Sequence, residues 1–159
     1  MSTLVTCFSH TGHTAALAHQ IAMRLGATED PILERGGRSG IWGIVTGALA
    51  AALGLGSRIA APERHPAGFD LVVIGTPVWS LGAAPAVNRY IDQHRRAIGK
   101  VAFFCTEDGA GGRGALARME RRLGKVPVAR LVVTEADLST RAIDKDLGRF
   151  VAEIGAAQG

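Results

Sequence analysis

Short apolar runs alternate along the chain with longer segments in which apolar residues recur every three or four positions. The clearest run is Leu71-Val72-Val73-Ile74, and a continuous run of this kind is typical of a strand that is buried on both faces of a parallel sheet. The second strand holds Asp30 and Pro31, so we expect it at an edge of the sheet. The predicted strands cover residues 3–9, 28–33, 70–75, 101–106 and 129–134.

The segments between these strands are predicted as helices, over residues 14–25, 85–96, 114–123 and 141–155 and within residues 39–55. A regular alternation of strands and helices with right-handed crossovers gives an α/β fold with a doubly wound five-stranded parallel sheet. The 159 residues are an ordinary length for one domain. We therefore expect a single domain over residues 1–159.

Residues 39–57 carry no charge and lie between Arg38 and Arg58. The segment has the length of a membrane span and contains the small-residue pair Gly43 and Gly47. Its five glycines lower its hydrophobicity, and a span here would place the strands on opposite sides of a membrane. We therefore expect no integral membrane span but a helix that covers the sheet. Its remaining apolar face predicts a homodimer.

The net charge is +4, with 20% charged and 47% hydrophobic residues, a composition typical of a globular protein. The charge excess is modest and no basic stripe is interleaved with aromatic residues, so we expect no nucleic-acid partner. Cys7 and Cys105 lie within predicted strands without metal-ligand spacing. They are interpreted as buried, unpaired thiols of a reducing compartment, which favours a cytoplasmic location and no bound metal.

The chemistry is expected where the first strand meets the first helix. This loop is Ser9-His10-Thr11-Gly12-His13-Thr14. Free amides and the dipole of a helix N-terminus bind phosphate, hydroxyl side chains add neutral donors, and glycine permits close approach of the backbone. An ordinary helix N-cap is the alternative interpretation of the same residues.

Two more loops leave carboxyl ends of predicted strands, where parallel sheets bind ligands at the point of reversed strand order. The loop after the third strand runs from Thr76 to Ala83 and presents Trp79, a rigid aromatic that can stack on a flat ring or else pack on the following helix. The loop after the fourth strand runs from Glu107 to Gly114. The three loops together predict one ligand site.

In these segments the chain resembles the flavodoxin-like family of FMN proteins, which includes flavodoxins and flavin-dependent quinone reductases. Residues 9–14 match the family's phosphate loop, Ser/Thr-x-Thr-Gly-x-Thr, and residues 70–79 and 100–114 resemble its two ring-binding regions. The resemblance implies strand order 2-1-3-4-5 and FMN as cofactor, with the phosphate in the first loop and the isoalloxazine between the other two. The implied cofactor-binding residues are Ser9, His10, Thr11, Gly12, His13, Thr14, Thr76, Pro77, Val78, Trp79, Ser80, Leu81, Gly82, Thr106, Glu107, Asp108, Gly109, Gly111 and Gly112.

Three departures from the family leave the role open. His13 replaces a frequent Asn, the third loop lacks an aromatic residue, and the chain is basic whereas electron-carrying flavodoxins are usually acidic. Two roles remain: electron transfer with a redox partner protein, or NAD(P)H-dependent reduction of a small acceptor such as a quinone. No residue is an evident catalytic acid or base.

Two alternatives remain open beside the flavin hypothesis. A flavodoxin-like fold without flavin would act as an interaction module. Alternatively, Gly109-x-Gly111-x-x-Gly114, with Glu135 after the next strand, formally fits the nicotinamide dinucleotide fingerprint. Glu107 and Asp108 argue against this second alternative, because their carboxylates would face and repel the pyrophosphate.

Overall fold

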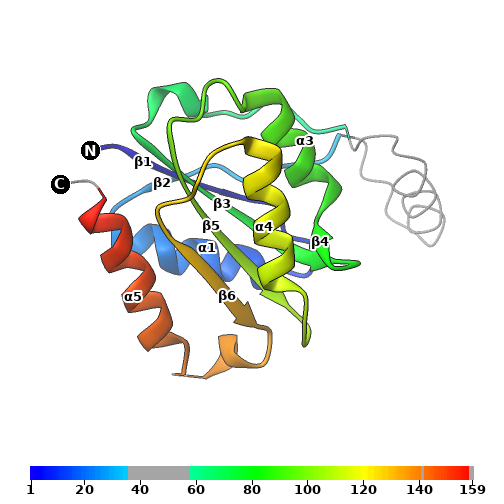
Figure 1. Cartoon of the computed structure of the whole chain (residues 1–159), viewed down its shortest axis with the longest axis vertical. Coiled ribbons are helices and arrows are strands. Elements are labelled where there is room, and N and C mark those ends of the chain that lie inside the picture. Colours follow the sequence, from blue (N-terminus) through cyan, green and yellow to red (C-terminus); the bar gives the residue numbers. More distant parts are fainter. Residues whose placement is uncertain (36–57, 141, 158–159) are drawn as a thin grey trace.

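The computed structural model describes residues 1–35, 58–140 and 142–157, and a central parallel sheet organises them (Figure 1). The strand order is β2-β1-β3-β5-β6, which confirms the predicted order 2-1-3-4-5. A short additional strand, β4, pairs antiparallel with the end of β3. The strands are β1 (Thr3–Cys7), β2 (Thr28–Glu29), β3 (Leu71–Trp79), β4 (Gly82–Ala83), β5 (Lys100–Glu107) and β6 (Arg130–Thr134).

Helices cover both faces of the sheet, and each face has its own hydrophobic core. Figure 1 shows α3 and α4 together on one face and α1 and α5 on the other. Tyr90 of α3 and Met119 of α4 belong to the first core, whereas Ile21 of α1 and Phe150 of α5 belong to the second. The helices are α1 (His13–Leu25), α3 (Pro85–His94), α4 (Gly112–Leu123) and α5 (Ile143–Ala156), with short 3-10 turns at Pro66–Gly68 and Asp137–Ser139.

Successive strand residues point to opposite faces, which explains how one apolar run supplies both cores. Phe103 belongs to the core under α3 and α4, and Phe104 to the core under α1 and α5. The ring of Phe104 lies over Gly75, where an added Cβ would be 2.0 Å from Phe104 Cζ. Only glycine therefore fits at this point of β3, one residue before the predicted second loop.

The structure corrects the boundaries of that second loop. Residues 76–79 are not loop but the last part of β3, which pairs with β5 as far as Pro77 and then with β4. Only Ser80 and Leu81 remain as a tight turn, and both have positive φ, 47° and 66°. The strand continues past the buried apolar run because its last residues pair with β4. These residues are not part of an apolar run, so the sequence pattern does not predict the extension.

The two cysteines are free and buried, as the sequence predicted. Cys7 is on β1 and Cys105 on β5, and β3 lies between these strands. The predicted helix over residues 39–55, and with it the dimer surface around Gly43 and Gly47, lies outside the described residues. Among the helices that are described, none has the length and hydropathy needed to span a membrane.

Candidate functional site

The N-terminus of α1 has the geometry of an anion site. Gly12 precedes the helix in a left-handed conformation, with φ 98° and ψ −14°, and as a glycine it has no side chain that could cap the helix. The Gly12 amide donates to Ser9 Oγ at 3.1 Å, and the exposed Thr11 adds a hydroxyl. No acidic residue lies in the first turn of α1. Amide and hydroxyl donors are thus grouped at the carboxyl end of β1.

The floor of this loop is built by two buried threonines. Thr14 Oγ1 and Thr106 Oγ1 are 2.8 Å apart and share a hydrogen bond. Each threonine is at most 2% exposed. Because Thr14 is on α1 and Thr106 on β5, this bond ties the first loop to the end of β5. Thr11, and not Thr14, therefore has the hydroxyl that is accessible from solvent.

His13 has a partner that sequence analysis did not place in the first loop. Its Nδ1 lies 3.1 Å from Glu135 Oε2, at the carboxyl end of β6, and 3.4 Å from Thr11 Oγ1. The Glu135 amide in turn donates to the carbonyl of Glu107 at 2.9 Å. The position of Glu135 directly after a strand was the available sequence signal, although sequence analysis considered it only as part of a dinucleotide fingerprint.

Trp79 brings the first and second predicted loops together. Its ring is nearly perpendicular to that of Phe8, with centroids 5.7 Å apart, and to that of His10, at 6.0 Å. The residue is 40% exposed. Neither neighbouring ring is stacked parallel to the indole, so these two rings do not cover its faces. Trp79 is therefore an accessible aromatic side chain at the edge of the Ser9–Thr14 loop.

The turn after Trp79 is held by α4 and the third loop. Arg118 Nη1 donates to the Leu81 carbonyl at 2.7 Å. An added Cβ at Gly111 would lie 2.9 Å from Leu81 Cδ2, so the third loop packs closely on the turn. Thr76 Oγ1 accepts from the Ala84 amide at 2.9 Å and fixes the other end of the hairpin. All three predicted loops therefore meet at one edge of the sheet.

The third loop ends at the N-terminus of α4, where a carboxylate of the same chain accepts the first helical amide. Gly111 precedes α4 with φ 106° and ψ −10°, and the Gly112 amide donates to Glu107 Oε2 at 2.6 Å. Gly112, predicted as loop, is the first residue of α4. A carboxylate at this N-terminus disfavours the dinucleotide hypothesis, because a pyrophosphate would need the same amide and meet the same negative charge. Asp108 and Gly109 remain exposed at the tip of the loop.

The two thiols near these helix starts are protected from solvent. Burial raises the pKa of Cys7 to about 12, and the charge of Glu29 adds to the effect. Burial, with Glu107, raises the pKa of Cys105 to about 12 as well. Only the thiolate is nucleophilic, so neither cysteine serves the site as a nucleophile at neutral pH.

No protein-family model and no curated protein matches the sequence, but solved structures match its fold. A flavoprotein from Lactobacillus acidophilus NCFM, crystallised in complex with FMN, has a TM-score of 0.71 at 21% identity and covers 91% of this chain and 97% of that chain. A putative flavoprotein from Bacteroides eggerthii DSM 20697 reaches 0.69 at 21% identity, with the same coverage of 91% and 97%. Two-electron reduced Megasphaera elsdenii flavodoxin reaches 0.60 at 14% identity, with coverage of 95% and 98%. The chain has a flavodoxin-like fold.

Proposed function

We propose that this chain binds FMN non-covalently and acts as a redox protein. The observation that carries the proposal is the meeting of the Ser9–Thr14 loop with Trp79 at the carboxyl ends of β1 and β3. The connections that leave β1 and β3 lead to opposite sides of the sheet, and such a switch point is where doubly wound sheets bind ligands. The FMN that accompanies the L. acidophilus flavoprotein of the same fold supports the choice of cofactor.

The residues present fit both ends of an FMN molecule. The uncapped start of α1, with Ser9 and Thr11 beside it, offers neutral donors to a phosphate dianion. Trp79, together with the turn at Ser80 and Leu81, offers an apolar surface to the isoalloxazine ring. The third loop would line the other side of the ring.

The flavin would supply the redox chemistry, and the protein would supply binding, orientation and electrostatic tuning. Two finer roles belong to the proposal: electron transfer with a partner protein, or NAD(P)H-dependent reduction of a small acceptor such as a quinone. We also propose that residues 1–159 act as one domain, in the cytoplasm and as a homodimer. No residue of the chain is proposed as a catalytic acid or base.

The test separates the two ends of the cofactor by titrating the full chain with FMN and with riboflavin, followed by flavin fluorescence. We expect Thr11→Val to weaken FMN binding roughly tenfold or more, because a hydrogen bond to a charged group contributes about 1.5–3 kcal/mol. Riboflavin binding should not change in this variant, since riboflavin has no phosphate. Trp79→Ala should weaken binding of both flavins, and Val126→Ala, a change at an exposed apolar residue beyond the end of α4, should weaken neither.

The same titration distinguishes the remaining alternatives. If wild-type protein binds neither flavin, the fold serves as an interaction module and the proposal is wrong. If FMN binds, anaerobic mixing with NADH or NADPH decides between the two redox roles. Rapid bleaching of the flavin absorbance indicates a reductase, and no bleaching indicates a carrier.

A further inference from the structure

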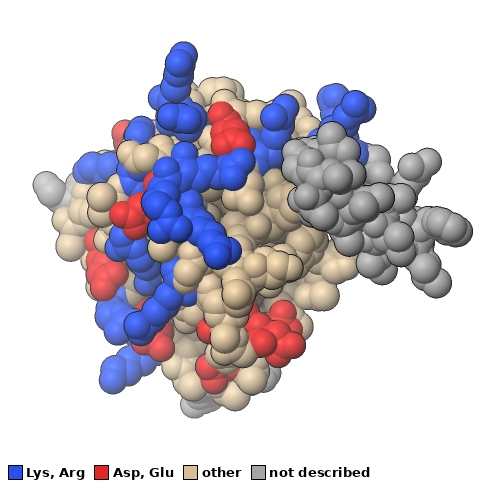
Figure 2. All heavy atoms as spheres, turned by 45° about the vertical axis from the view of Figure 1, so that its right-hand side comes forward, with Lys and Arg blue, Asp and Glu red and all other residues tan. Residues whose placement is uncertain are grey.

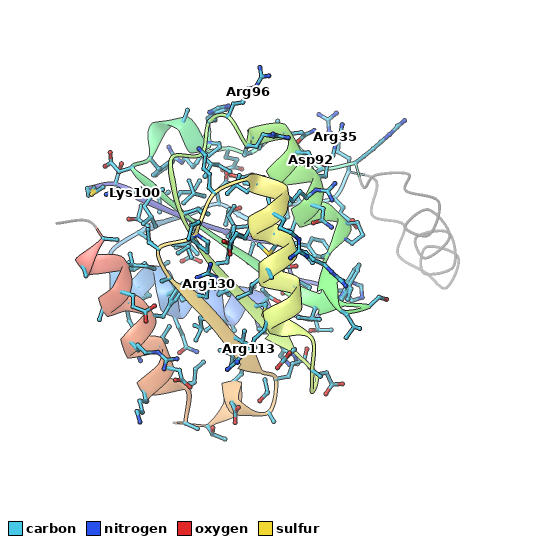
Figure 3. The ribbon with its side chains drawn as sticks, viewed as in Figure 1. Arg35, Asp92, Arg96, Lys100, Arg113 and Arg130 are labelled. Atoms are coloured by element: carbon cyan, nitrogen blue, oxygen red, sulfur yellow. The ribbon has the colours of Figure 1, made fainter. Side chains whose placement is uncertain are left out.

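The excess positive charge of the chain is concentrated on one face. Figure 2 shows a long band of Lys and Arg in which few Asp or Glu are interspersed. We define the α4 basic face by six side chains on α4 and the segment that follows it: Arg113, Arg118, Arg121, Arg122, Lys125 and Arg130. Figure 3 shows Arg113 at the start of α4 and Arg130 beside the helix.

Two carboxylates lie among these cations, and each is already paired. Asp92 of α3 accepts from Arg122 Nε at 2.8 Å and Nη2 at 2.7 Å, and Glu120 pairs with Arg130. Six cations minus two carboxylates leave an excess of four, which equals the net charge of +4 for the whole chain. The rest of the chain is therefore neutral in sum, and the face has an attraction for anions that the total charge understates.

Part of this charge has no counterpart on the molecule itself. Arg113 and Arg121 are exposed and form no ion pair within the described part of the chain. The positions outside that part include no Asp or Glu in the sequence. Within the described residues, these two guanidinium groups are therefore not neutralised by an ion pair.

The basic face continues directly into an exposed apolar tip. Arg118 of α4 donates a hydrogen bond to the carbonyl of Leu81. Leu81 is 58% exposed, and the nearby Trp79 is 40% exposed. Protein interfaces combine an apolar centre with arginines around it. An apolar tip lies at one end of an arginine-rich helix. This combination suits a folded protein as binding partner better than a uniformly charged polymer.

From this arrangement we infer that the α4 basic face and the Leu81–Trp79 tip dock an acidic protein, whose carboxylates face α4 and whose apolar side chains contact the tip. A nucleic acid fits less well, because Trp79 is the only aromatic among the exposed large apolar side chains of the described residues, so these residues form no platform for successive bases. The inference goes beyond the proposed function. It shares Trp79 and Leu81 with the proposed flavin surface, so the experiment tests it through the arginines of α4.

The experiment uses the full chain and a fluorescent oligoglutamate of about 20 residues as a carboxylate probe at about 0.02 M salt, where surface charges are weakly screened. The double variant Arg113→Gln/Arg121→Gln should bind the probe roughly tenfold more weakly. The control Lys145→Gln/Arg149→Gln removes the same charge from α5 and should change binding less than about twofold. Leu81→Ser should weaken docking of an acidic protein recovered with the wild-type chain, without changing the affinity for the oligoglutamate.

Matched titrations with single-stranded DNA of about 20 nucleotides and with phosphatidylserine vesicles complete the test. Tighter binding of the DNA or the vesicles than of oligoglutamate, lost in the Arg113/Arg121 variant, would replace the acidic protein by that ligand. An equal loss in both double variants, or no binding of the oligoglutamate, would overturn the inference. FMN titrations of the two double variants keep this outcome separate from that of the proposed function, because Arg113 and Arg121 are not among the predicted cofactor-binding residues and their substitution should leave FMN affinity unchanged.

Discussion

The starts of α1 and α4 have nearly the same backbone and different occupants. Gly12 has φ 98° and ψ −14°, and Gly111 has φ 106° and ψ −10°. Each glycine directly precedes its helix near the carboxyl end of a parallel strand. Neither glycine has a side chain that could cap its helix. At α4 the carboxylate of Glu107 accepts the Gly112 amide, whereas at α1 the neutral hydroxyl of Ser9 accepts the Gly12 amide. Backbone geometry alone therefore does not define an anion site.

The side chains around each helix N-terminus determine which anion can bind there. Glu107 brings its negative charge from the preceding strand, so the attraction of the α4 dipole is satisfied within the chain. The first loop has Ser9, Thr11 and two histidines and lacks a carboxylate of its own. Since Glu135 contacts the histidine side chain and not the helix amides, the start of α1 is the one suited to a ligand phosphate.

Giving α1 an internal carboxylate should have the largest effect. In Ser9→Asp a negative charge would lie beside the proposed phosphate position, and at about 5 Å and an effective dielectric near 20 each negative charge of the phosphate is repelled by about 3 kcal/mol before salt screening. FMN affinity should fall roughly a hundredfold, while the flavin-free protein becomes more stable by about 0.5 kcal/mol through the helix dipole. Fluorescence titration and urea unfolding measure the two effects, with Ser9→Asn as the uncharged control. A loss of FMN affinity as large in Ser9→Asn would remove charge as the cause.

A methyl group at α4 should be the next largest change. In Gly112→Ala the added Cβ would lie 2.5 Å from Val132 Cγ1 and 2.8 Å from Glu107 Oε2, and overpacking of this kind lowers the free energy of unfolding by about 2 kcal/mol. The equivalent first residue of α1 is the exposed His13, so His13→Ala should cost less than about 0.5 kcal/mol. Urea unfolding of the two variants without flavin makes the comparison. Equal losses would mean that the two helix starts are packed alike.

Neutralising the internal carboxylate should have a smaller effect. Glu107→Gln keeps an oxygen acceptor for the Gly112 amide but removes the charge, which should lower the free energy of unfolding by about 1 kcal/mol. Under the proposal that the start of α1 holds the phosphate, FMN affinity should stay within about threefold, because Glu107 caps the other helix. Thermal melting and FMN titration of the same sample check both statements. A strong gain in anion binding at α4 in this variant would show that the start of α4 is a second phosphate site.

The smallest expected effect concerns the chemical labelling of the cysteine that lies beneath the N-terminus of each helix. Cys7 Sγ contacts the Thr14 carbonyl at 3.9 Å, and Cys105 Sγ would lie 3.0 Å from a Cβ on Gly112. With both thiol pKa values raised to about 12, the thiolate fraction at pH 8 is on the order of 0.0001 and iodoacetamide should label neither. Raising the pH toward the pKa of each thiol should increase labelling of both. Mass spectrometry should show that Gly112→Ala speeds labelling of Cys105 but not of Cys7.

The sheet was predictable from the sequence, because its apolar runs are continuous and each is followed by a helical segment. Leu71-Val72-Val73-Ile74 is a local pattern and lies in β3 as predicted. The loop predicted from Ser9 to Thr14 is shorter in the structure, because α1 begins at His13. The hairpin between Trp79 and Gly82 was missed, since its pairing depends on support from Arg118, far along the chain.

The partners of the site residues were beyond local patterns for the same reason. The contact of His13 with Glu135 and the bond of Thr14 with Thr106 join distant segments that only the folded sheet brings together. Glu107 is close in sequence to Gly112, yet its role as a cap depends on the left-handed conformation of Gly111. The sequence therefore indicates a candidate site, and the fold decides which of its polar groups remain available to a ligand.

The ratio of the dissociation constants of riboflavin and FMN for the wild-type chain tests the central claim most directly, since the two ligands differ only by the phosphate. Several charge-assisted hydrogen bonds at the start of α1 should make FMN bind at least about a hundredfold more tightly than riboflavin. The ratio should fall in Ser9→Asp and stay unchanged in Glu107→Gln. Equal affinities of wild-type protein for riboflavin and FMN would contradict the account, because the start of α1 would then be no phosphate site.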